Sequence, residues 1–148
     1  MRPWLAGLLL LVGAGCGGPA PRALRYGMDE CSHCHMQLAD PRFGGEVVTT
    51  TGKVYPFDDV GCLGTFVATG GIPGEELYSL WVVDFLNADS LIAVADAVFL
   101  LSDSVKTPMQ YGLAALRPGA AADSLAEVWN ATRLDWSEVL ARLGPAGP

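Results

Sequence analysis

Residues 31–36 hold most of the side chains in this sequence that could bind a metal or do redox chemistry. The run Cys-Ser-His-Cys-His-Met places two thiols, two imidazoles and a thioether within six residues. A Cys-x-x-Cys loop lets both sulfur atoms converge on one point, which serves metal sites and redox disulfides alike. A thioether combined with thiolates selects copper(I), a soft ion, over zinc. The motif therefore predicts a copper(I) site with Cys31, Cys34 and Met36 among its ligands.

Further residues could supply donors to this site. Met109 follows Pro108 in the segment 102–111, which the fixed φ of proline would make rigid, so its thioether could reach the site if the two halves of the chain pack together. The alternative role for Met109 is to fill a gap in the core. The alternative for Cys62 is to be a small buried hydrophobic residue. The secondary candidate ligands are His35, His33, Met28 and Cys62.

The Cys-x-x-Cys pair alone leaves other kinds of site open. Cys31 and Cys34 could form a disulfide or redox pair, or hold zinc with a histidine or Cys62. With His35 the motif is also Cys-x-x-Cys-His, which attaches c-type haem, and Met109 could then be the second axial ligand. Single-haem cytochromes wrap the haem in helices, however, whereas residues 46–57 favour strands and turns. A c-type cytochrome and a zinc- or thiol-dependent protein stay as alternatives to copper binding.

An enzyme is the third class of function that the thiols allow. A thiol oxidoreductase or a lyase would pair thiolates with a proton-donating carboxylate, for which Asp58 or Asp59 is available. Both aspartates also stand where a helix is expected to begin, and capping that helix is the simpler role. We therefore expect a binding protein and not an enzyme.

Residues 1–15 have the layout of a lipoprotein signal peptide. Arg2 precedes an apolar run at residues 4–12, and small residues then lead into Cys16. The run is about half of the ~20 residues that a transmembrane helix needs. Its Val-Gly-Ala-Gly-Cys ending resembles a bacterial lipobox, with Gly13 where leucine is usual. We expect Cys16 to carry diacylglycerol and an acyl chain such as palmitate, which would anchor the protein in the cell envelope, facing the periplasm or the cell exterior.

The composition of the remaining chain limits its partners. Without Arg2, eight basic residues face sixteen acidic ones, which argues against nucleic acid and against a polybasic contact with lipid. If Cys16 carries lipid, three cysteines remain. In an oxidising compartment they cannot all pair within one chain, so at least one must be free, metal-bound or bridged to another molecule.

The strands and helices expected along the chain, which must position the motif, predict an α+β fold of two tandem β-β-α-β modules. Residues 16–27, with two prolines, predict a tether; residues 28–86 form the first module and residues 87–148 the second. In the first module we expect strands at 46–51, 54–57 and 77–85, and a helix capped by Asp58 or Asp59 and ended by Gly70-Gly71.

The second module is expected to repeat this order. The expected strands are 97–101, 113–116 and 132–136. A helix at about 123–130 would bury Leu125, Val128 and Trp129. A terminal helix would run from Ser137, its cap, to Leu143 and stop at Gly144.

Four motifs in this order resemble the NosL family, lipoprotein copper chaperones that accompany nitrous oxide reductase. They are Glu30-Cys31 to Met36, Asp40, Phe57 to Cys62 leading into a helix, and Thr107-Pro108-Met109 followed by Gly112 to Ala115. The resemblance implies two β-β-α-β modules related to the organomercurial lyase fold. It also implies copper(I) ligands among Cys31, Cys34, Met36 and Met109, and delivery of the ion to an apo-enzyme or its assembly machinery.

Two positions depart from the family pattern. Family members often carry glycine in place of His35, and a small or aromatic residue in place of His33. The additional imidazoles would shift the preference of the site towards copper(II) or zinc, or change the partner that receives the metal.

Overall fold

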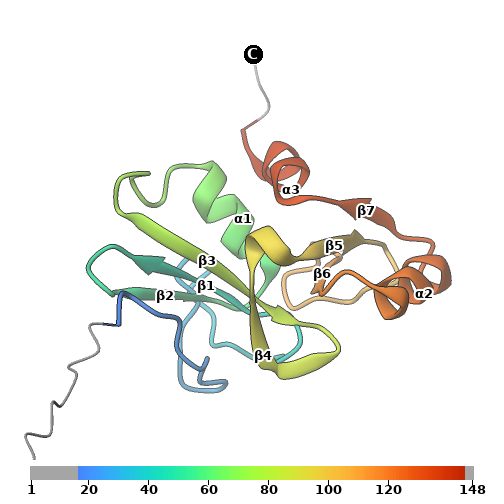
Figure 1. The fold of residues 1–148 in the computed structure, drawn as a ribbon, viewed down its shortest axis with the longest axis horizontal. Helices are drawn as coiled ribbons and strands as arrows, with labels where there is room; N and C mark the ends of the chain where they lie inside the picture. The colour runs from blue at the N-terminus through green and yellow to red at the C-terminus, as the bar shows by residue number, and fades with distance from the viewer. Residues whose placement is uncertain (1–16, 146–148) are drawn as a thin grey trace, which may run out of the picture.

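In the computed structural model, residues 17–145 form two antiparallel sheets that share a hydrophobic core (Figure 1). The expected signal peptide and Cys16 lie outside these described residues. Within them, no helix has both the length and the apolar character that a membrane span requires.

The first sheet has the strand order β2-β1-β3-β4. Its elements are β1 (Gly45–Thr49), β2 (Val54–Phe57), α1 (Val60–Ala68), β3 (Leu77–Asp84) and β4 (Asn87–Ala93). The two strands predicted before α1 are present and pair with each other, as are the helix and the third strand, β3, which pairs with β1. Strand β4 was not predicted, because its first residues, Asn-Ala-Asp-Ser, have low β propensity. It extends the first sheet into the stretch that the sequence assigned to the second module.

The second sheet has the order β6-β5-β7. After the short 3₁₀ helix η1 (Val94–Asp96), its elements are β5 (Val98–Leu101), β6 (Leu113–Leu116), α2 (Ala120–Val128), β7 (Thr132–Leu134) and α3 (Trp136–Leu143). Strand β7 pairs with β5, as β3 does with β1. The α+β class is therefore confirmed. The first sheet has one strand, β4, more than the predicted first β-β-α-β module.

The predicted buried face of α2 was partly wrong. Val128 is 78% exposed, whereas Ala122 and Ala126 are buried and Leu125 and Trp129 are partly buried. The two alanines lie one turn apart on the same face of the helix, and this face packs on the smaller cluster that contains Leu100 and Ala114. Apolar size alone pointed to Val128, and the packing surface is set by the alanines instead.

Helix α3 begins at a different cap from the one predicted. Its N-cap is Asp135 rather than Ser137: the Asp135 side chain accepts from the Glu138 backbone N–H, and the Glu138 side chain accepts from the Asp135 backbone N–H. This reciprocal capping box satisfies two backbone donors at once, which a serine two residues later cannot do.

Alternation along the strands divides the interior into two layers. On β5 and β6, Phe99, Leu113 and Ala115 face the main core, while Leu100 and Ala114 face a smaller one under α2. Helices α1 and α3 pack on each other over the main core (Figure 1). A backbone hydrogen bond of 2.9 Å from Phe85 to Ala115 also joins the two sheets.

Gly61 sits where α1 meets the loop before β6. An alanine Cβ at this position would overlap the Tyr111 side chain, including its Cβ and Cγ atoms. We expect Gly61→Ala to lower the free energy of unfolding by about 1–3 kcal/mol, because the loop must shift to make room. Urea denaturation would measure this. Gly74→Ala, where an added Cβ would meet nothing within 4 Å, is the matched control and should change stability by less than about 0.5 kcal/mol. Equal effects of the two changes would contradict this packing.

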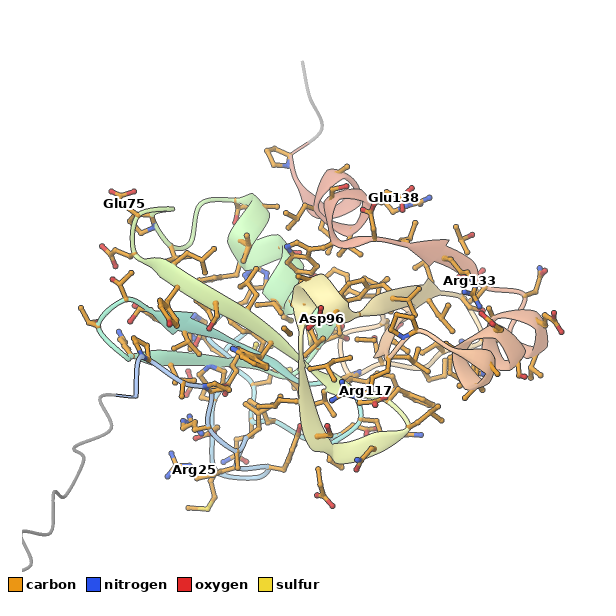
Figure 2. All side chains as sticks on the ribbon, viewed as in Figure 1. Arg25, Glu75, Asp96, Arg117, Arg133 and Glu138 are labelled. Atoms are coloured by element: carbon orange, nitrogen blue, oxygen red, sulfur yellow. The ribbon has the colours of Figure 1, made fainter. Side chains whose placement is uncertain are left out.

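The first part of the N-terminal segment (residues 17–44) lies below the first sheet in the view of Figure 1, and the loop that follows it reaches α1, where Cys31 and Cys34 meet Cys62. Figure 2 shows Arg25 on this segment at the lower edge of the view, with Glu138 of α3 towards the upper edge. The buried Asp29 carboxylate accepts hydrogen bonds from the side chains of Arg22 and Arg25. Burial favours the neutral acid, but these bonds outweigh it and lower the pKa of Asp29 to about 2. This ion pair fixes the chain directly before the Cys-x-x-Cys loop.

Glu46 on β1 is the second buried acid near this segment. Its Oε1 accepts from the Arg22 backbone N–H at 2.8 Å, and Oε2 has no hydrogen-bond partner in the described part of the chain. Burial raises the pKa of Glu46 to about 7, despite the favourable backbone hydrogen bond and charge of Arg22.

Glutamine at position 46 is expected to stabilise the protein at alkaline pH. The folded state keeps the Glu46 proton up to about pH 7, whereas the carboxyl releases it near 4.5 when unperturbed, so wild-type stability falls as the pH rises between these values. Glu46→Gln removes this loss, which should amount to on the order of 1–3 kcal/mol at about pH 8 and little at about pH 4. Urea denaturation of both proteins across this range tests it, and a pH-independent difference would contradict it.

Candidate metal centre

Three thiols converge at the edge of the main core. The Sγ atoms of Cys31, Cys34 and Cys62 lie within 4.8 Å of one another, and all three cysteines are free. Cys31 and Cys34 come from the loop before β1, and Cys62 comes from the first turn of α1. The sequence had placed Cys62 only among the secondary candidates, and the structure puts its sulfur beside both cysteines of the motif.

Backbone hydrogen bonds close the loop that carries the first two cysteines. The Cys31 N–H donates to the Met36 carbonyl at 2.8 Å, and the His35 N–H donates to the Cys31 carbonyl at 3.0 Å. Ser32 N–H donates to the Pro56 carbonyl of β2 at 2.8 Å, which attaches the loop to the first sheet. His35 has a φ of 62°, a left-handed conformation that glycine adopts at less cost. This gives a physical reason for the glycine that the NosL family often carries at this position.

Asp59 positions the third cysteine by capping α1. Its Oδ1 accepts from the Gly61 N–H at 2.8 Å, which starts the helix and sets Cys62 in its first turn. Its Oδ2 accepts from the Met109 N–H at 3.0 Å, so the same carboxylate also holds the loop between β5 and β6. Asp58 turns to the other side and accepts from the Ala39 N–H at 2.8 Å. Asp59 therefore has the predicted capping role, whereas Asp58 accepts from the loop before β1 and does not cap α1.

Hydrogen bonding within the cluster concentrates negative charge on Cys31. The Cys62 thiol donates to Cys31, which lowers the pKa of Cys31 well below that of a free thiol; burial opposes this, and the backbone N–H groups of Cys34, Asp58 and His33 add to it. The same hydrogen bond raises the pKa of Cys62, and burial raises that of Cys34. Cys31 is thus the thiol of the cluster that loses its proton most readily, and a thiolate is the form that binds a metal.

The other predicted ligands lie around this cluster at different depths. Met109 is half-buried and packs against the hydrophobic cluster that contains Cys31 and Cys62. Met36 and Met28 are 58% and 72% exposed. His33 is half-buried, and the exposed His35 side chain contacts Glu30 at 3.1 Å through Nδ1. The structure therefore brings together three thiols, and no histidine within residues 17–145 joins them within 4.8 Å.

This placement disfavours the haem alternative. Covalent attachment would need both cysteines of the motif beside the haem edge and a histidine on its iron. Cys31 is instead fully buried against Cys62, and His35 points outward to Glu30.

Comparisons with known proteins agree with this architecture. No known family model matches the sequence, and no curated protein does. Among solved structures, the chain is similar to the crystal structure of the copper chaperone NosL from Shewanella denitrificans. The TM-score is 0.70, with 20% sequence identity, over 82% of this chain and 96% of that one. The resemblance to NosL that the motifs indicated is thus confirmed at the level of the fold, and this neighbour is a chaperone rather than an enzyme.

Proposed function

We propose that this protein binds copper(I) at the cluster of Cys31, Cys34 and Cys62 and delivers it for assembly of a copper enzyme. The observation that carries the proposal is the convergence of three sulfur atoms within 4.8 Å of one another. The shared fold with a copper chaperone supports the same conclusion. Nitrous oxide reductase, as apo-enzyme or with its assembly machinery, is the recipient that the family resemblance implies.

The donor set favours copper(I) over zinc. Structural zinc sites are tetrahedral and have four ligands. The cluster has three cysteine ligands, and within residues 17–145 no histidine, further cysteine or carboxylate joins them as a fourth ligand. Copper(I) accepts such a sulfur-rich set at low coordination number. The thioethers of Met36 and Met109 are the additional donors that we expect to keep the ion reduced and exchangeable.

Attachment to the outer face of a membrane completes the proposal. A diacylated Cys16 would hold the folded domain next to the bilayer through the short tether predicted at residues 16–27. The chain would then act in the envelope compartment, where its acidic surface discourages contact with nucleic acid.

Anaerobic titration of the reduced chain, residues 16–148, tests the proposal. Copper(I) added against a competing chelator should bind one ion per chain with a dissociation constant well below about 1 µM. X-ray absorption at the copper edge should show sulfur ligands. Retention no tighter than about 1 µM, or zinc bound in preference to copper(I), would contradict copper binding. Activation of the apo form of nitrous oxide reductase by the loaded protein tests the recipient separately.

A further inference from the structure

The three sulfur ligands differ in their access to solvent. Cys31 and Cys62 are both 0% exposed, and Cys34 is partly exposed. The two buried cysteines belong to the hydrophobic cluster formed with residues such as Phe57, Val60 and Leu63, whereas Cys34 packs at its margin. An incoming ligand can therefore reach the cluster beside Cys34 without opening the core.

The residues next to Cys34 make this side a route for a soft ion. His35 and Met36 follow it in the chain, and both side chains are mostly exposed. Their loop is held to the fold by the Ser32 to Pro56 hydrogen bond, so Cys34 stays at the surface end of a fixed cluster. Imidazole and thioether are both ligands that copper(I) accepts.

We infer that Cys34 is the exchange ligand of the site, while Cys31 and Cys62 retain the ion. This inference rests on the proposed copper(I) binding. An acceptor thiol approaches beside Cys34 and loses its proton as its sulfur–copper bond forms. The bond from copper to Cys34 then breaks, and the released thiolate takes up a proton. Copper stays in the +1 state throughout, and the intermediate holds the ion between Cys31, Cys62 and the acceptor.

Exchange of copper(I) at Cys31 or Cys62 would cost more free energy than exchange at Cys34. Displacement of copper from Cys31 or Cys62 by an external ligand requires space that core side chains fill. Close-packed interiors contain few voids, so such an attack needs a local opening of the fold. Exchange at Cys34 requires neither space inside the core nor a local opening of the fold.

Chemical rescue of two matched variants tests the inference. Cys34→Ala and Cys62→Ala each remove one sulfur from the cluster, and each should lose one sulfur ligand in X-ray absorption of the copper(I)-loaded chain. Added 2-mercaptoethanol should restore the lost ligand in Cys34→Ala, where the vacated position is open to solvent, and not in Cys62→Ala. Rescue of both variants, or of neither, overturns the assignment of Cys34. A wild-type chain that retains no copper(I) overturns the proposed function as well.

Alkylation of the reduced wild-type protein keeps the inference testable if Cys62→Ala fails to fold. A maleimide should modify Cys34 at least about tenfold faster than Cys31 and Cys62, since buried thiols react only through local opening. Peptide mapping by mass spectrometry identifies the order of modification. Equal rates at the three cysteines would overturn the inference.

Discussion

Cys31→Ser should lower the affinity for copper(I) by about 100-fold or more, beyond the 10–100-fold typical of residues that only support a metal ligand. Cys31 is the thiol on which the cluster concentrates negative charge, because it accepts hydrogen bonds from Cys62 and from the backbone. Serine has the same branching as cysteine but supplies a hard oxygen that copper(I) binds poorly. The dissociation constant, from competition with a chelator under anaerobic conditions, is the measurement.

Met36→Leu is the matched comparison for this loss. Met36 lies in the same loop, but its side chain is 58% exposed, whereas Cys31 is fully buried. We expect its replacement to weaken binding by only about tenfold, the lower end of the range for a supporting residue. A Cys31→Ser protein that binds copper(I) as tightly as Met36→Leu would exclude Cys31 as a principal ligand.

The local parts of the site could be predicted from the sequence. The Cys-x-x-Cys spacing identifies Cys31 and Cys34, and the pair of aspartates followed by apolar residues identifies the start of α1. Both depend on neighbours along the chain, which single-sequence patterns describe well. The role of Cys62 is different, because its sulfur meets the loop through contacts between residues distant in sequence, such as the hydrogen bond from Ser32 to Pro56 of β2. The signal available in the sequence was the odd number of cysteines left after Cys16.

The parts of the fold that were missed are those that packing decides. Strand β4 has weak β propensity and exists because β3 offers a partner, with Val82 opposite Ile92. On α2, the face that packs on the smaller cluster carries Ala122 and Ala126, and the larger Val128 lies on the exposed side. Tertiary contact overrides local preference in both cases. The reach of Met109 is also a tertiary property, since a carboxylate on another element fixes its backbone.

That carboxylate, Asp59, leads to the second large expected effect. Asp59→Ala removes the cap of α1 and the acceptor of the Met109 N–H together. Loss of an N-cap costs about 1 kcal/mol, and an unsatisfied buried donor about 1–3 kcal/mol, so we expect a loss of about 2–4 kcal/mol in the free energy of unfolding. Because the helix start sets Cys62 and the loop sets Met109, copper(I) affinity should fall as well. Urea denaturation and chelator competition measure the two effects.

Two further variants separate the contributions of Asp59. Asp135→Ala removes the exposed cap of α3. The Asp135 carboxylate accepts no hydrogen bond from another element of the described chain, so this change should cost only about 1 kcal/mol. Asp59→Asn keeps an oxygen for the Gly61 N–H but turns an amide donor towards the Met109 N–H, so it should fall between wild type and Asp59→Ala. If Asp59→Ala were no more destabilising than Asp135→Ala, the carboxylate would serve as a helix cap alone. The two halves of the site would then be held together by side-chain packing, with no polar link between α1 and the Met109 loop.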